Sequence, residues 1–113
     1  MTDHLTQTFA ALADPTRRAI LAQIASAKSL TVNSIVAGQK LSQPAISKHL
    51  KVLEKARLIR KVKSAKTRPC TINAEGFMVA RDWIETYRDY WQGAFGRIDQ
   101  LIIDLQSKET KSE

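Results

Sequence analysis

Cysteine, histidine and glycine are scarce in this chain of 113 residues, which contains one Cys, two His and four Gly. A single cysteine can neither form a disulfide within the chain nor build a thiolate cage for a metal ion. The glycines are widely spaced and form no phosphate-cradling loop, and no nucleophile can be matched with a base. The sequence therefore predicts a protein that is not an enzyme and that holds no metal and no cofactor.

Long apolar runs are lacking too. No run approaches the roughly 18 residues that a membrane-spanning helix needs, and the start, MTDHLTQTFA, lacks the basic head and apolar centre of a secretory signal. We therefore expect a cytoplasmic protein with no membrane partner. The hydrophobic content of 43% is enough for one small core. We expect a single domain over residues 1–106 and a disordered tail over residues 107–113.

Two helices are predicted near the N-terminus. Apolar residues at helical spacing predict the first over residues 5–13. Asp14 and Pro15 mark the start of the second, because Asp accepts hydrogen bonds from free backbone N–H groups and Pro fits the first helical turn.

A helix-turn-helix unit follows. Thr31 is the predicted cap of a third helix, which should end at the turn-forming residue Gly38. Ser42 is the predicted cap of a fourth helix, which reaches residue 55 or 56. Two short helices joined by a tight turn are typical of DNA-binding proteins.

The fourth helix has two unlike faces. At 100° per residue, one side collects Ala45, Ile46, His49, Leu50, Val52, Leu53 and Ala56. The other side carries Gln43, Pro44, Ser47, Lys48, Lys51 and Lys55. Ammonium, amide and hydroxyl groups on one face are suited to contact phosphates and base edges in a major groove.

Positive charge is concentrated next to this helix. The chain has a net charge of +7, and nine of its 18 Lys and Arg residues lie between Lys48 and Arg68, with Glu54 as the only acid among them. This is the footprint expected of a protein that binds double-stranded DNA. Other polyanions and an incidental solvated charge run are the alternatives. RNA is disfavoured, because the basic segment has no aromatic residue on which a base could stack.

A β-hairpin is predicted over residues 58–73, around a polar turn near residues 64–67. The candidate inward positions are Ile59, Val62, Cys70 and Ile72. Pro69 cannot donate a hydrogen bond to a central ladder, so its strand should lie at an edge or pair only partly there.

A heptad pattern runs through the C-terminal segment. Phe77, Ile84, Trp91, Ile98 and Leu105 recur every seven residues, and Ala80, Tyr87, Ala94 and Leu101 lie between them. We expect one long helix over residues 74–105 whose apolar stripe is covered by a second copy of the chain. Gly93 and Gly96 are unfavourable in a helix and would mark a kink or a close crossing.

The segments FAALADPTRRAIL and LTVNSIVAGQKLSQPAISKHLKVLEKARLI, with the aromatic final helix, resemble the ArsR-type winged helix-turn-helix regulators over residues 9–105. The resemblance implies a mainly α fold with a small β-hairpin (α-α-α-α-β-β-α) that dimerises through its first and last helices. It also implies that residues 42–55 form the recognition helix and residues 60–68 the wing. Metal-sensing relatives carry a cysteine pair before the recognition helix, or Asp and His ligands on the last helix. This sequence has neither set, which indicates the subgroup without metal sites.

We therefore predict a homodimeric bacterial repressor that binds double-stranded DNA at a palindromic operator and whose effector is unknown. The predicted DNA-binding residues are Ser42, Gln43, Pro44, Ser47, Lys48, His49, Lys51, Lys63, Lys66 and Arg68. The predicted dimer-interface residues are Leu5, Phe9, Phe77, Ile84, Tyr87, Trp91, Ile98 and Leu101. The alternatives are a repressor switched by oxidation of Cys70 and a nucleic-acid-binding protein without sequence preference.

The roles of several individual residues can be interpreted in two ways. His49 is either a packed, hydrogen-bonded ring or a phosphate contact, and Cys70 is either a buried apolar group or a redox switch. The aromatic residues of the last segment either pack or line an effector pocket: Trp83, Tyr87, Tyr90, Trp91 and Phe95. Arg17 and Arg18 stand at a helix start, where cations are unfavourable, so each needs a phosphate or a carboxylate partner.

Overall fold

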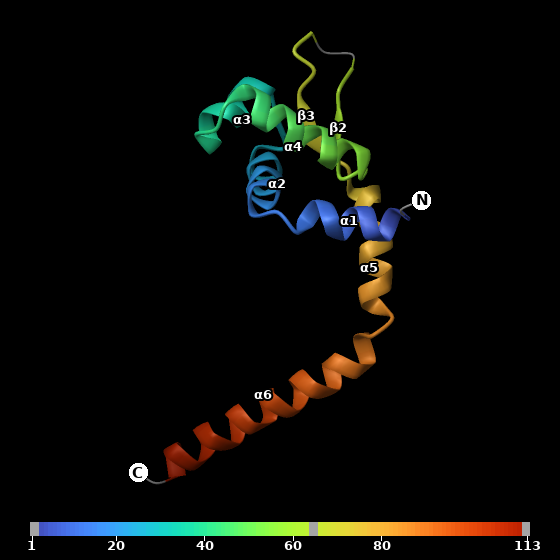
Figure 1. Ribbon diagram of the computed structural model, residues 1–113. Helices are drawn as coiled ribbons and strands as arrows, with labels where there is room; N and C mark the ends of the chain where they lie inside the picture. Colours follow the sequence, from blue (N-terminus) through green and yellow to red (C-terminus); the bar gives the residue numbers. More distant parts are fainter. Residues whose placement is uncertain (1–2, 64–65, 112–113) are drawn as a thin grey trace. The chain divides into compact units, whose positions relative to one another are not determined.

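The chain divides into two compact units, Met1–Ala80 and Arg81–Glu113, where the sequence led us to expect one domain over residues 1–106. We call them the N-terminal unit and the C-terminal unit. The structure is a computed structural model that describes residues 3–63 and 66–111 (Figure 1).

Four helices form most of the N-terminal unit: α1 (His4–Leu12), α2 (Pro15–Ala27), α3 (Val32–Gln39) and α4 (Gln43–Lys55). Their starts confirm the caps predicted from the sequence. Asp14 accepts a hydrogen bond from the backbone N–H of Arg17 at 3.0 Å, and Ser42 accepts one from Ala45 at 3.3 Å. Thr31 caps α3 in the same way, so local side-chain hydrogen bonds fix where each of these helices begins.

The end of α3 differs from the prediction. The helix continues through Gly38 to Gln39, and the left-handed residue that ends it is Lys40, at φ 56°. Gly38 instead leaves room for the Gln23 side chain, since a Cβ there would lie 2.4 Å from its Nε2. The Gln23 amide donates to the carbonyl oxygen of Ser34 at 3.2 Å and so ties α2 to α3.

A small antiparallel sheet in the order β1-β3-β2 completes the unit: β1 (Ser29–Leu30), β2 (Ile59–Lys61) and β3 (Cys70–Ile72). The β2–β3 hairpin confirms the predicted one, whereas β1 was not predicted. Of the two alternatives for the strand at Pro69, the edge position is wrong, because β3 is the central strand, and the partial pairing at Pro69 is confirmed. Pro69 precedes β3 and has no backbone N–H to donate. Its carbonyl oxygen accepts a hydrogen bond from the N–H of Val62 at 2.9 Å.

The core confirms most of the predicted inward positions. The fully buried large residues are Ile20, Ile24, Ile35, Ile46, Leu50, Leu53, Leu58, Ile59, Thr8 and Cys70. Val62 and Ile72 are half-buried. Val52 is an exception, because it lies in the predicted apolar sector of α4 but is 40% exposed.

The C-terminal segment is not one helix, so that prediction was wrong. A short 3-10 helix, η1 (Ala74–Phe77), precedes α5 (Met78–Glu85) and α6 (Arg88–Lys111). The break falls at Thr86, whose hydroxyl donates to the carbonyl oxygen of Asp82 at 3.0 Å, a side-chain bond that competes with regular helix geometry.

Two further expectations for this segment differ from the structure. α6 passes through Gly93 and Gly96 without interruption, so neither glycine marks a kink at the helix break. α6 also continues to Lys111, across most of the segment for which we predicted disorder, and residues 112–113 lie outside the described part. Among the helices of the described residues, none is long and apolar enough to cross a membrane.

Candidate nucleic-acid interface

α4 is fixed by its apolar side and presents its polar side to solvent. Ile46, Leu50 and Leu53 are buried in the core. Most of the predicted contact residues of this helix and its cap are exposed: Ser42, Gln43, Pro44, Lys48 and Lys51. Ser47 is half-buried. The fold therefore aligns six of the seven predicted residues of this segment on one side of one helix.

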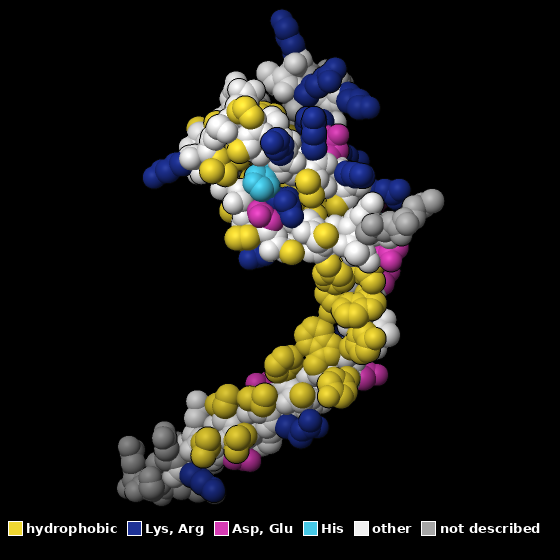
Figure 2. Space-filling view, viewed as in Figure 1, with side chains coloured by type: hydrophobic (Ala, Val, Ile, Leu, Met, Phe, Trp, Pro, Cys, Tyr) yellow, Lys and Arg dark blue, Asp and Glu magenta, His cyan; other side chains and the backbone are white. Residues whose placement is uncertain are grey.

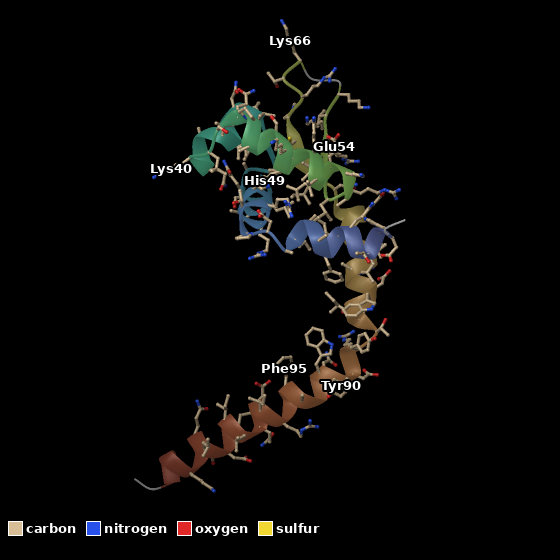
Figure 3. The ribbon with its side chains drawn as sticks, in the orientation of Figure 1. Lys40, His49, Glu54, Lys66, Tyr90 and Phe95 are labelled. Carbon is tan, nitrogen blue, oxygen red and sulfur yellow. The ribbon has the colours of Figure 1, made fainter. Side chains whose placement is uncertain are left out.

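The wing residues lie beside this helix, because α4 packs against β2. Lys63, Lys66 and Arg68 are all exposed, and Lys66 lies at the far end of the β2–β3 connection (Figure 3). The middle of this connection, residues 64–65, lies outside the described residues.

A cationic groove joins the two elements. It has a volume of about 380 Å³ and is lined by Glu54, Arg60, Lys61, Lys63 and Arg68. Figure 2 shows Lys and Arg side chains gathered over the same part of the N-terminal unit. The cations that line this groove all come from the hairpin, and α4 contributes Glu54 to the lining. The exposed cations Lys48 and Lys51 lie on α4 itself, which packs against β2 of the hairpin.

These cations are not neutralised within the described part of the chain. None of the nine Lys and Arg residues from Lys48 to Arg68 has a carboxylate oxygen within 4.0 Å in residues 3–63 and 66–111. Glu54 is the only acid that lines the groove. Like charges that lack counter-ions repel, and binding a polyanion relieves that repulsion.

His49 is the predicted contact that the structure places elsewhere. Its ring lies between α4 and the start of α2 (Figure 3). Its Nδ1 is 3.5 Å from Nη1 of Arg17 and 3.9 Å from Oδ2 of Asp14. This geometry favours the packed interpretation of His49, in which the ring helps to hold α4 against α2.

Arg17 and Arg18 have partners that the sequence did not predict. Nε of Arg17 donates to the carbonyl oxygen of Ala11 at 2.7 Å, and Nη2 donates to that of Ala10 at 3.0 Å. Nη1 of Arg18 donates to the carbonyl oxygen of Leu12 at 2.6 Å. Both cations thus stand at the C-terminal end of α1, where the helix dipole favours positive charge.

Cys70 lies in the core and not on a reactive surface. Its side chain has no exposed area. Burial raises the pKa of the Cys70 thiol, which keeps the sulfur protonated at neutral pH. A protonated, buried thiol reacts slowly, and this weakens the redox alternative.

The predicted dimer-interface residues fall into two groups. Leu5 and Phe77 are half-buried, and Phe9 is exposed. The residues of α5, α6 and their connection are exposed: Ile84, Tyr87, Trp91, Ile98 and Leu101. Apolar side chains run along the visible face of α6 (Figure 2). Nothing in the described part of the C-terminal unit covers this stripe.

The aromatic residues do not form one enclosed pocket. Trp83 and Tyr87 make an edge contact with ring centroids 5.2 Å apart, and Trp91 and Phe95 form a second pair at 6.0 Å. Tyr90 is 82% exposed. A shallow hollow of about 350 Å³ lies along part of this face, lined by Ile84, Glu85, Arg88, Trp91, Gln92 and Phe95.

Metal-ligating side chains are dispersed. Within residues 3–63 and 66–111, no three His, Cys, Asp or Glu side chains gather where they could hold an ion. α3, the helix before α4, contains no cysteine.

Comparison with known proteins agrees with this geometry. The family model described as "Bacterial regulatory protein, arsR family" matches residues 14–61, from the cap of α2 to the end of β2. The HTH-type transcriptional regulator Rv2034 of Mycobacterium tuberculosis is 34% identical over 100 residues, which are 88% of this chain and 89% of that protein. The chain belongs to the ArsR family. As an ArsR family member it is a DNA-binding transcriptional regulator.

Solved ArsR structures have the same fold. A crystal structure of an ArsR family transcriptional regulator has a TM-score of 0.70 and 33% identity, covering 80% of this chain and 98% of that one. An ArsR-like transcriptional regulator from Rhodococcus sp. RHA1 has a TM-score of 0.68 and 26% identity, covering 87% and 92%. The fold of this ArsR protein is therefore a winged helix-turn-helix, with the β2–β3 hairpin in the position of the wing.

Proposed function

We propose that this ArsR protein is a homodimeric repressor that inserts α4 into the major groove of a palindromic operator. Gln43, Pro44, Ser47, Lys48 and Lys51 contact the groove, and Ser42 caps the helix beside the backbone. Lys63, Lys66 and Arg68 contact the phosphate backbone or the minor groove. The observation that supports this proposal is that α4 and the hairpin pack together and carry exposed cations that have no carboxylate within 4.0 Å in the described residues.

The homodimer is proposed from the apolar stripe of α6. Ile98 and Leu101 are 52% and 58% exposed, and exposed apolar stripes of this length mark association surfaces. A two-fold pair of chains presents two copies of α4, so we expect two inverted half-sites about one turn of DNA apart. We further propose repression, which the family resemblance implies, and a cytoplasmic location, because bacterial chromosomal DNA is there.

A binding experiment with three variants tests the DNA-contacting residues. The operator is first selected from a random duplex library, and affinity is then measured by fluorescence anisotropy at several salt concentrations. Gln43→Ala should lower the preference for one base pair by about 1–3 kcal/mol. Lys66→Ala should weaken binding to every duplex and reduce the salt slope by about one phosphate contact.

The matched control is Lys108→Ala, which removes the same charge from α6, a helix to which no DNA contact is assigned. It should change neither affinity nor salt slope. Equal loss on the operator and on random DNA with Gln43→Ala would contradict the base-reading role of α4. Loss with Lys108→Ala as large as that with Lys66→Ala would mean that the effect is one of net charge alone.

A further inference from the structure

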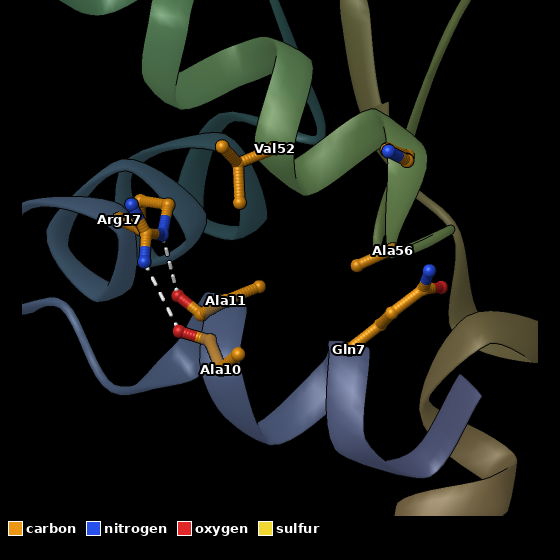
Figure 4. A pocket seen from close by; sticks show the side chains of 7 residues that line it. Gln7, Ala10, Ala11, Arg17, Val52 and Ala56 are labelled. Carbon is orange, nitrogen blue, oxygen red and sulfur yellow. Dashed lines mark hydrogen bonds between the residues drawn. The ribbon is translucent and has the colours of Figure 1, made fainter. Parts of the chain in front are cut away.

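A hollow of about 300 Å³ lies between α1 and α4 in the N-terminal unit, and none of the residues proposed above to contact DNA lines it (Figure 4). It is lined by Gln7, Ala10, Ala11, Arg17, Val52, Lys55 and Ala56. This volume is at the lower end of the range found for small-molecule sites, which is about 300–1,000 Å³.

Two links brace the hollow at its ends. Nε2 of His4 donates to the carbonyl oxygen of Ala56 at 2.9 Å and joins the start of α1 to the end of α4. At the other end, Arg17 bonds the carbonyl oxygens of Ala10 and Ala11 and reaches His49 of α4. Figure 4 shows Arg17 beside these two carbonyls, with Val52 across the space from Ala11.

The side chains between the links explain why the space stays open. Ala10, Ala11 and Ala56 are too short to fill it, and no larger apolar side chain lines it apart from Val52. Val52 is 40% exposed although it stands on the apolar side of α4. An apolar occupant would remove this valine from water, which is favourable by about 25 cal/mol for each Å² of apolar surface buried.

The polar groups of the hollow favour an anion. Its lining contains Arg17, Lys55 and the amide of Gln7, and no carboxylate. Lys55 is exposed and has no ion pair within residues 3–63 and 66–111. Arg17 uses three of its nitrogens in the contacts above, but a guanidinium has five N–H groups, so further donors remain.

We propose that this hollow is a binding site for a small carboxylate with an apolar body, of the size of a medium-chain fatty acid. The carboxylate pairs with Lys55 and takes remaining N–H groups of Arg17, and the chain lies against Val52 and the alanines of α1. Such a ligand contacts α1 and the recognition helix at once. It is therefore placed to act on the position of the helix that reads DNA.

Titration with sodium octanoate tests the site without using DNA. Amide chemical shifts of the uniformly ¹⁵N-labelled full chain are followed, with octan-1-ol as the neutral probe of equal length. Octanoate should produce saturable shifts at Gln7, Ala11 and Val52–Ala56, and octan-1-ol should bind at least severalfold more weakly. Equal binding of the two probes, or shifts confined to the aromatic face of α6, would overturn the proposal.

Three variants separate charge from shape. Lys55→Gln should weaken octanoate binding about threefold to tenfold, a change equivalent to about 0.7–1.4 kcal/mol. Ala10→Leu, at an exposed helical position that tolerates leucine, should abolish binding by filling the hollow. Lys108→Gln, the charge-matched control on α6, should bind octanoate as the wild type does. Wild-type affinity in both Lys55→Gln and Ala10→Leu would place the octanoate elsewhere and refute the site.

Discussion

Leucine side chains lie in opposite environments in the two units of the chain. In α4, Leu50 and Leu53 are 1% and 0% exposed, whereas in α6, Leu101 and Leu105 are 58% and 54% exposed. Both helices have an apolar side, but only that of α4 has neighbours in the described structure that cover it. The N-terminal unit thus buries its own apolar side, whereas the exposed apolar side of α6 is the surface that the proposed homodimer would cover.

Charge divides the two units in the same way. The basic segment lies wholly in the N-terminal unit, while residues 81–113 contain five Lys and Arg against seven Asp and Glu. The N-terminal unit is therefore suited to a polyanion and the C-terminal unit is not. The units thus differ both in what covers their apolar side chains and in the partner that their charge favours.

The largest effect should come from removing one leucine from each unit. Leu53→Ala should lower the free energy of unfolding by about 2–5 kcal/mol, because it opens a cavity in a closed core. Leu101→Ala should leave the unfolding of the N-terminal unit unchanged and weaken self-association about tenfold. Urea unfolding and sedimentation equilibrium measure the two quantities. An equal loss in the free energy of unfolding with Leu101→Ala and with Leu53→Ala would contradict this difference between the units.

A second pair of variants adds a methyl group to each unit. At Gly76, a Cβ would lie 1.5 Å from the carbonyl oxygen of Arg57, whereas at Gly93 the nearest atom is Nη1 of Arg97 at 3.9 Å. Gly76→Ala should therefore destabilise the N-terminal unit by about 1–3 kcal/mol. Gly93→Ala should instead stabilise α6 by up to about 1 kcal/mol, because alanine has the higher helix propensity, and so raise its helix content. Circular dichroism at 222 nm during unfolding detects both changes.

A smaller, stabilising effect is expected at the end of α3. Lys40 has φ 56°, and a left-handed conformation costs a residue with a side chain about 1–2 kcal/mol. Lys40→Gly should therefore stabilise the N-terminal unit by about 0.5–1 kcal/mol after the greater chain entropy of glycine is counted. Ala37→Gly, inside the same helix, should destabilise it by about 1 kcal/mol. Thermal unfolding distinguishes the two, and a loss of stability with Lys40→Gly would contradict this account.

The smallest effect concerns pH and the cap of α2. The backbone hydrogen bond from Arg17 lowers the pKa of Asp14 below its usual 3.8 in spite of some desolvation, and the charges of Arg17 and His49 act in the same direction. A lowered pKa means that the ionised cap stabilises the fold above pH 3.8 and that this contribution is lost as the pH falls through the folded-state pKa.

Asp14→Asn keeps a hydrogen-bond acceptor and removes the charge. Its stability should lie below that of the wild type at pH 7 and approach it near pH 3, as measured by urea unfolding. Asp99→Asn, in the C-terminal unit, is the control and should leave the unfolding of the N-terminal unit unchanged at both values. A difference for Asp14→Asn that is the same at pH 7 and pH 3 would exclude a role for the carboxylate charge.

Sequence reasoning succeeded where one residue and its near neighbours decide the structure. Asp14, Thr31 and Ser42 each bond a backbone N–H three residues ahead, so helix starts can be read locally. The buried side of α4 followed from the 3.6-residue period, with the exception of Val52, which lines the hollow between α1 and α4.

Features that depend on the packing of distant segments could not be predicted. β1 has two residues and exists because Leu30 pairs with Cys70, forty positions later. The partners of Arg17 depend on the angle between α1 and α2, which no sequence pattern encodes. The hollow beside Val52 likewise requires two helices and two cross-links to be known at once. Between α5 and α6, the break at Thr86 could not be predicted because the heptad pattern continues across it.

The contacts of Arg17 connect two helices that have separate roles in the proposed function. One guanidinium touches α1, through which we expect two copies to pair, and the histidine of the helix that we expect to read DNA. Dimerisation and DNA binding would then both depend on the position of this one side chain. We would then expect operator occupancy to rise steeply with the concentration of the chain, because formation of the proposed dimer would also position the recognition helix.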